Sequence, residues 1–297
     1  MQQVKDAPAL WLDDGIADPA AVDLYRTTRT ADGVAGFGSV TDDHVARFKS
    51  EGYLVVEDAF SPAMVAAAID GLLDLIDGQR PDFLDGQQVN ASGIQFEAGA
   101  ADLLPTLSRD QKQDVVRKLI GFVEHEPRLA AVAEHPPLID VVTRIMGERP
   151  LMFQDQALLK PPLIGREKPW HQDIAFFTLP ADSMIVGVWV ALDEATPENG
   201  CMHVIPGSHR AGPVPHFQRR DWQICDADVA VDEVVAVPLR PGSLLLFHGL
   251  IHHGTPPSRS PNRRRALQIH YKPESIARIE EEERLAVFGS EGKNVTC

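Results

Sequence analysis

From Pro150 onward the chain consists of short apolar runs separated by glycine and proline residues, and this pattern limits the possible folds more than any other. Apolar runs of this length, bounded by turn residues, predict β-strands. The expected strands are 151–159, 185–192, 202–205, 234–237, 244–247 and 265–271. Many short strands at near-regular spacing favour a double-stranded β-helix, a cupin-like jelly roll whose concave end can hold a metal ion.

The part of the chain before Pro150 is mainly helical in its pattern. Capping residues and apolar residues at helical spacing predict four helices, with one strand between the first two. The expected helices are 41–52, 61–78, 111–123 and 136–147, and the strand is 53–56. We therefore expect an α+β fold in which an N-terminal helical region packs on one sheet of the jelly roll.

No shift in composition forces a division of the chain into two domains. Residues 1–39 are polar and lack periodicity, so we expect a poorly ordered arm there. Residues 40–297 would then form a single domain, with a helical part 40–150, a jelly-roll core 151–273 and a charged C-terminal helix and tail 274–297. The segment 79–110 is rich in loop residues, has a possible strand at 94–96, and could serve as a lid.

Charge and cysteine content exclude several classes of partner. A net charge of −15 argues against nucleic acid or an anionic membrane, and any anionic substrate would need a local basic pocket. Three cysteines, without the spacing of a metal site, favour free thiols in a reducing compartment. The longest apolar run, 184–192, is too short to cross a bilayer, so we expect a cytoplasmic protein.

A candidate metal site begins in the stretch 168–173. His171 and Asp173 are two residues apart on an extended chain, so both side chains face the same way and can meet one cation. A third ligand can come from the stretch 247–255, which offers His248, His252 and His253. Neighbours on a strand face opposite ways, so His252 and His253 cannot both point inward. Two histidines and one carboxylate leave half of an octahedron open, which suits non-haem Fe(II).

Seven short motifs occur in an order that resembles the phytanoyl-CoA dioxygenase family of Fe(II)/2-oxoglutarate-dependent oxygenases. The resemblance covers roughly residues 40–273. The motifs are Lys160-Pro161-Pro162, Trp170-His171-Gln172-Asp173, the stretch 188–193, the stretch 198–202, the stretch 205–209, Pro241-Gly242-Ser243, and His253-Gly254-Thr255 followed by Arg264.

The resemblance implies a role for each matching residue. His171, Asp173 and His253 match the metal ligands, and the spacing of eleven residues to Arg264 favours His253 over His252. Arg264 matches the arginine that binds the distal carboxylate of 2-oxoglutarate, as a planar guanidinium can do through two hydrogen bonds. Four further positions would contact or approach this co-substrate: Thr255, Gln172, Trp189 and Lys160.

The orientation of Arg264 fixes that of its neighbours on the same strand. If Arg264 faces the site, alternate residues from Ala266 to His270 face it as well, and the residues between them pack beneath the helices.

The resemblance also implies a reaction, in which 2-oxoglutarate and O2 are consumed, succinate and CO2 are released, and an unactivated C–H bond of a small molecule is hydroxylated. Similar enzymes desaturate, epimerise or rearrange rings. Halogenases of this build have a small residue at the position of Asp173, so the carboxylate argues against halogenation.

Two alternatives remain open. The same three ligands could hold Zn(II) or Mn(II) in a cupin-like isomerase or hydrolase that needs no 2-oxoglutarate, or the protein could bind a ligand without catalysis. The substrate depends on variable loops such as 79–110 and 210–232, and the pattern leaves the oligomeric state open.

Overall fold

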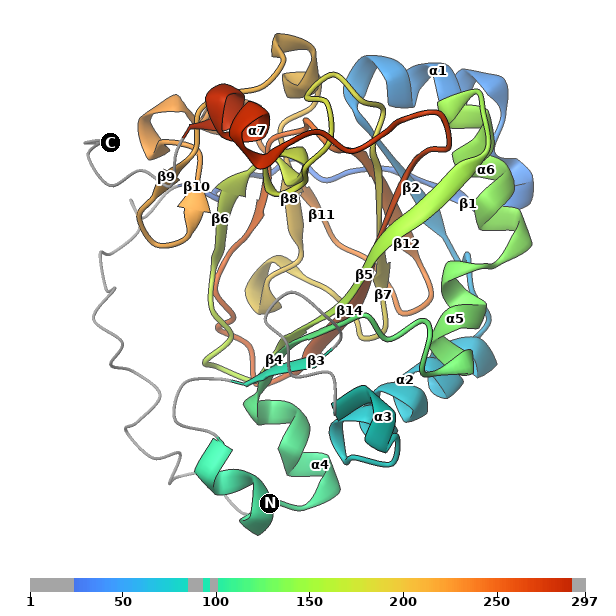
Figure 1. Ribbon diagram of the computed structural model, residues 1–297, viewed down its shortest axis with the longest axis vertical. Coiled ribbons are helices and arrows are strands. Elements are labelled where there is room, and N and C mark those ends of the chain that lie inside the picture. Colours follow the sequence, from blue (N-terminus) through green and yellow to red (C-terminus); the bar gives the residue numbers. More distant parts are fainter. Residues whose placement is uncertain (1–23, 85–92, 97–100, 290–297) are drawn as a thin grey trace.

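Two facing β-sheets form the centre of the protein, as the computed structural model shows for residues 24–84, 93–96 and 101–289 (Figure 1). The larger sheet has eight strands, in the spatial order β1 (Gly33–Ala35), β2 (Tyr53–Glu57), β12 (Leu244–His248), β7 (Val186–Ala191), β14 (Arg264–Pro273), β5 (Pro150–Lys160), β4 (Val116–Ile120) and β3 (Gly93–Phe96). The smaller sheet has four, in the order β11 (Val235–Val237), β8 (Met202–Val204), β13 (His253–Thr255) and β6 (Lys168–His171). The fold is the expected jelly roll.

Antiparallel pairing between strands far apart in sequence brings polar side chains to one face of the large sheet. In β14, Gln268 lies opposite Gln156 of β5 on one side and Trp189 of β7 on the other. Arg264, four residues earlier, lies opposite Lys160. Since side chains alternate along a strand, these residues share the inner face.

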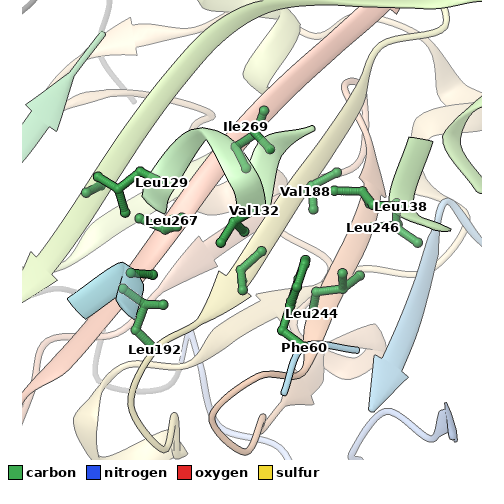
Figure 2. Packing of buried hydrophobic residues seen from close by; sticks show 14 of the residues in the cluster. Phe60, Leu129, Val132, Leu138, Val188, Leu192, Leu244, Leu246, Leu267 and Ile269 are labelled. Atoms are coloured by element: carbon green, nitrogen blue, oxygen red, sulfur yellow. The ribbon is translucent and has the colours of Figure 1, made fainter. Parts of the chain in front are cut away.

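Helices cover the outer face of the large sheet (Figure 1). They are α1 (Asp42–Glu51), α2 (Pro62–Ile76), α5 (Pro127–Ala133) and α6 (Pro136–Met146). In Figure 2, Leu129 and Val132 of α5 lie against Leu267 and Ile269 of β14, and all four are buried. Burying a side chain of this size contributes about 1.5–3 kcal/mol, so this interface stabilises the fold substantially.

A second apolar cluster fills the space between the two sheets. It includes Trp189, Phe247 and Ala266 from the large sheet with Met202 and Val204 from the small sheet. All are buried. This packing holds the two sheets together beside the polar part of the jelly roll interior.

Local signals placed the helix ends correctly. Ser61 caps α2 by accepting a hydrogen bond from the backbone nitrogen of Met64 at 3.3 Å, and Pro62 occupies the first turn. Gly52 ends α1 and Gly147 ends α6, with φ angles of 85° and 79°. These left-handed conformations favour glycine, which is why both helices stop there.

The helix expected over 111–123 is wrong. Two short turns, α4 (Arg109–Lys112) and a 3-10 turn over Gln113–Val115, precede β4, which pairs with β5 on one side and β3 on the other. The pairing with β3 contains a register shift, and Val116 and Leu119 both reach the outer core. A bulge therefore produced apolar residues three apart, the spacing that otherwise indicates a helix.

The C-terminal helix begins later than expected. It is α7 (Glu281–Phe288), whereas residues 274–280 are not helical. Backbone bonds to other segments hold this stretch: Glu274 N donates to Arg149 O at 3.0 Å and Ile279 N to Thr178 O at 3.1 Å. The expected helix over 274–284 is thus wrong over its first part.

Residues 24–39 are held against the rest of the chain by specific contacts, which corrects for this part the expectation of a poorly ordered arm over 1–39. β1 pairs with β2, and the backbone carbonyl of Leu24 accepts a hydrogen bond from Trp170 Nε1 at 3.2 Å. Tyr25 stacks on Trp170 with ring centroids 5.4 Å apart. Residues 1–23 lie outside the described part.

Three other expectations meet the structure with different results. Cys201 is a buried free cysteine, but Cys225 is disulfide-bonded, so the expectation of free thiols is wrong there. The strand expected at 94–96 is β3, while residues 85–92 and 97–100 of the possible lid lie outside the described part. Within the described ranges, no helix has the length and apolar character needed to span a membrane.

The remaining α-helix and strands are α3 (Pro81–Leu84), β9 (Phe217–Gln218) and β10 (Trp222–Gln223).

Candidate active site

A cavity of about 400 Å³ opens between the two sheets. Strands β4, β5 and β14 of the large sheet and β6 and β13 of the small sheet contribute side chains to its wall. This volume is within the usual range for small-molecule sites. The polar inner face of β14 thus borders an enclosed space large enough for a ligand.

His171, Asp173 and His253 meet at this cavity. His171 ends β6, Asp173 begins the 3-10 turn that follows, and His253 begins β13, directly opposite His171 in the strand pairing. One potential ligand atom from each lies within 4.8 Å of the others. Asp173 Oδ1 is 3.2 Å from His171 Nε2 and 3.4 Å from His253 Nε2. The sequence pattern therefore predicted a real cluster.

Backbone carbonyls orient both imidazoles. His171 Nδ1 is 2.7 Å from Pro169 O, and His253 Nδ1 is 3.0 Å from Ile251 O. A carbonyl oxygen only accepts, so each Nδ1 carries the hydrogen and each Nε2 keeps its lone pair for the space between the rings.

The second oxygen of Asp173 is held by β14. Asp173 Oδ2 lies 2.9 Å from Gln268 Nε2 and 2.7 Å from His270 Nε2. These contacts fix the rotation of the carboxylate and leave Oδ1 facing the two imidazoles. Partners of this kind orient metal ligands and tune their affinity.

Burial and neighbouring charges set the protonation that a metal site needs. Burial and the neighbouring His253 lower the pKa of His171 to about 4, so this imidazole is neutral near pH 7. Burial alone would raise the pKa of Asp173, but His253 and His270 beside it bring that pKa well below its usual value. A neutral imidazole and an ionised carboxylate are the forms that bind a cation.

The three ligand atoms fit an octahedral ion. Atoms about 2.1 Å from one ion and at right angles around it lie about 3.0 Å apart, close to the two distances given above. Two imidazoles and one carboxylate are the donor set of non-haem Fe(II), with positions left for other ligands. The site therefore fits Fe(II).

Arg264 supplies a buried positive charge on the same cavity wall. It is 2% exposed and donates one hydrogen bond, from Nη1 to Leu158 O at 3.0 Å, while its Nε has no partner among the described residues. Burial lowers the pKa of Arg264 to about 10, so the group stays charged near pH 7. Its guanidinium lies 5.4 Å from the centre of the Trp189 ring. No carboxylate within the described ranges pairs with it, so the site suits an anionic ligand.

Three of the four other expected co-substrate residues line the cavity: Thr255, Trp189 and Lys160. Thr255 is two residues beyond His253 on β13 and shares its face. Lys160 Nζ donates to Arg166 O at 2.6 Å and Pro256 O at 2.5 Å, with Thr255 O at 3.4 Å. Its donors are therefore occupied in holding two loops together.

Gln172 does not line the cavity, which corrects the expectation for this residue. It lies between His171 and Asp173, so it faces the other way. Its side-chain nitrogen donates to Gly212 O and Leu250 O, and its oxygen accepts from Val214 N. Gln172 therefore holds the segment 212–214 and the turn at Leu250 in place.

The other candidate histidines do not join the triad. His252, next to His253, is half-buried and outside the cavity, as strand alternation required. His248 accepts a hydrogen bond from Leu250 N and His216 from Gln172 N, both at 3.0 Å. His203 and His209 contact backbone carbonyls. These residues support the surrounding chain.

Sequence reasoning left some site residues without a role. Gln268 and His270 were expected to face inward, and the same alternation could have identified them as supports for Asp173. Lys118 of β4 also lines the cavity. It was missed because its segment was expected to be a helix.

A jelly roll with two imidazoles and one carboxylate arranged for Fe(II) defines a non-haem iron enzyme. The sequence profile of the phytanoyl-CoA dioxygenase family matches residues 48–266, and the chain belongs to this family. It is therefore an Fe(II)/2-oxoglutarate-dependent oxygenase, and its donor set fits that cofactor.

Individual relatives agree with this assignment. The chain is 28% identical over 262 residues to "Phytanoyl-CoA dioxygenase domain-containing protein 1" of Danio rerio, covering 78% of this chain and 89% of the relative. Its fold is similar to the alpha-ketoglutarate-dependent carbocyclase SnoK from nogalamycin biosynthesis, with a TM-score of 0.62, 19% identity and 89% and 97% coverage. It is also similar to EctD from S. alaskensis, with a TM-score of 0.60, 24% identity and 85% and 81% coverage.

Proposed function

We propose that the protein hydroxylates an unactivated C–H bond of a small-molecule metabolite, converting 2-oxoglutarate and O2 to succinate and CO2. The observation that carries this proposal is the buried cluster of His171, Asp173 and His253 in one cavity with the charge of Arg264, which pairs with no carboxylate of the described ranges. The cluster provides for the metal and Arg264 for the dicarboxylate.

Each residue has a separate task in this reaction. When bound, the iron and 2-oxoglutarate together supply the oxidising power for attack on a C–H bond. His171, Asp173 and His253 hold the metal through Nε2, Oδ1 and Nε2. Arg264 binds the distal carboxylate of 2-oxoglutarate through its free donors, and Thr255 adds a hydroxyl hydrogen bond. Fixing both ends of the co-substrate sets its orientation before the reaction.

Two further residues, Trp189 and Lys160, shape the end of the cavity where the co-substrate would bind. Trp189 forms an apolar wall beside the guanidinium. Lys160 keeps the backbone of Thr255 and Pro256 close to β5, and burial together with the nearby Arg264 lowers the pKa of this lysine well below its usual value. We infer that Lys160 acts on the co-substrate mainly by positioning β13.

Hydroxylation is preferred over halogenation because Asp173 occupies the coordination position that a halide would need. The fold is also similar to a carbocyclase, so product analysis must allow for ring closure as well as hydroxylation. A product heavier by one oxygen atom supports hydroxylation, and a product lighter by two hydrogens indicates desaturation or ring closure.

The first test is binding and turnover of the co-substrate. Anaerobic addition of 2-oxoglutarate to the Fe(II) protein should produce a weak visible charge-transfer band, and admission of air should slowly release succinate without added substrate. Arg264→Ala should lose both signals. Arg263→Ala should keep them, because Arg263 pairs with Asp110 and Asp114 on the surface.

Unchanged succinate release in Arg264→Ala would place the co-substrate elsewhere. Turnover with Zn(II) or Mn(II) but without 2-oxoglutarate would favour the cupin-like isomerase or hydrolase instead.

A further inference from the structure

Lys118 is a cation on the cavity wall that has no partner among the described residues. It lies in β4, opposite Leu158 of β5 on one side and Gln95 of β3 on the other. It is half-buried, and no hydrogen bond or ion pair joins its ammonium group to any of the described residues. The described part of the chain therefore leaves this charge available to a ligand.

The other cations of the cavity, Arg166 among them, either have partners within the chain or serve the co-substrate in the proposed function. Lys168 Nζ lies 2.7 Å from Asp221 Oδ2 and 4.6 Å from the centre of the Phe176 ring. Arg117 lies 4.0 Å from the same carboxylate oxygen. Lys160 is held by backbone carbonyls, and Arg264 is committed to the co-substrate in the function proposed above. Lys118 is thus a charge that the proposed function does not use and that pairs with no described residue.

Amide side chains accompany Lys118 along the inner face of β3 and β5. Gln95, Gln154 and Gln156 line the same cavity. Gln156 Nε2 is 3.4 Å from Gln154 Oε1, while Gln156 Oε1 is buried and has no partner among the described residues. A buried acceptor without a partner is unfavourable, so a ligand that donates a hydrogen bond there would relieve it.

An aromatic wall lies near the metal ligands. Phe176 and Phe177 line the cavity, and Phe176 is 38% exposed although it is large and apolar. The Phe176 ring packs edge-on to His171, with centroids 5.5 Å apart. An apolar group resting on this ring would lie next to the metal ligands.

We propose that the prime substrate is a small amphipathic molecule whose carboxylate, or similar anionic group, binds Lys118 while its apolar part lies against Phe176 near the metal. This inference rests on the proposed function and adds the substrate class to it. The chain carries a net charge of −15, which repels anions at long range, so an anionic substrate needs a dedicated local cation.

The electrostatics of Lys118 agree with this assignment. Burial and the nearby Lys168 lower the pKa of Lys118 to about 8, so its charged form gains little stabilisation from the described residues around it. A bound carboxylate would supply the missing partner, and charge-assisted hydrogen bonds of this kind are among the strongest in proteins.

The test compares acids with their neutral amides. Binding of 3-phenylpropionate and 3-phenylpropionamide, and of hexanoate and hexanamide, is measured by equilibrium dialysis under anaerobic conditions with Fe(II) and saturating 2-oxoglutarate, which occupies Arg264. The full chain should prefer each acid by about tenfold or more. The preference should disappear in Lys118→Met and Lys118→Gln, persist in Lys118→Arg, and persist in Lys49→Met, a control at an exposed position.

Three outcomes overturn the inference. The first is an equal affinity for acid and amide in the unaltered chain. The second is an acid preference that survives in both neutral variants with native melting temperatures. The third is loss of the 2-oxoglutarate band in Lys118→Met, which would assign Lys118 to the co-substrate.

A different result would contradict the proposed function rather than the role of Lys118. That result is the absence of a 2-oxoglutarate band in the unaltered chain. The acid and amide pairs are then compared on the metal-free chain, where the effect of Lys118 variants still supports or overturns the binding of an anion.

Discussion

The two faces of β14 serve different purposes. On the outer face, Leu267 and Ile269 pack under the helices, and on the inner face Gln268 and His270 hold Asp173. Alternation of side chains places these opposite demands on neighbouring residues. Stability and chemistry are therefore separated by a single peptide unit, and each can be changed with little effect on the other.

The largest expected effect on the inner side comes from Asp173→Ala. The change removes one of three metal ligands and leaves Gln268 and His270 without their acceptor. Changes in supporting residues alone lower metal affinity by about 10–100-fold, so loss of a ligand should lower it by about 100-fold or more. Iron binding, measured by competition with a chelator, checks this. Iron affinity equal to that of the unaltered chain would remove Asp173 from the metal site.

On the outer side, Leu267→Ala should lower the free energy of unfolding by about 2–5 kcal/mol, because it leaves a cavity under α5. Urea unfolding of the metal-free protein measures the change. The folded fraction should still bind iron and 2-oxoglutarate normally. A lower affinity for either in the folded protein would contradict the separation of the two faces.

A smaller inner-face effect is expected for His270→Phe. The ring keeps its contacts with Phe177 and Phe247 but loses the hydrogen bond to Asp173 Oδ2. Iron affinity should fall by about 10–100-fold, while the melting temperature of the metal-free protein stays within a few degrees of its starting value. A large loss of stability without a change in iron affinity would show that His270 is a packing residue.

The smallest outer-face effect is expected for Tyr271→Phe. The Tyr271 hydroxyl donates to Ala133 O at 2.5 Å and ties β14 to the end of α5. Its loss should lower the free energy of unfolding by about 1 kcal/mol. Denaturant titration measures this, with unchanged iron binding as the control.

Much of the metal cluster could be predicted from the sequence because it depends on local alternation and on one long-range pairing. His171 and Asp173 are two residues apart, and β6 and β13 bring His253 opposite His171. The same alternation implied that Gln172 faces away, although the resemblance placed it near the co-substrate. Here the local geometry was the better guide.

The part of the site formed by β4 could not be predicted in the same way. Nothing near Lys118 in sequence indicates that β4 pairs with β5, some forty residues later. Nothing there indicates either that the pairing of β4 with β3 contains a bulge. Residues 274–280 illustrate the same limit, because bonds to Arg149 and Thr178 override their local preference. The local sequence indicates which secondary structure a segment prefers. Where two structures are close in energy, contacts with residues distant in sequence decide between them.

The length of β14 has a consequence for how the protein matures. Ten residues pair with β5 along one edge and six with β7 along the other. A slip of one position would turn Arg264 toward the helices and Leu267 toward the cavity. Such a molecule would lose its apolar contacts together with its metal support, so a misaligned chain could not persist as a stable but inactive enzyme.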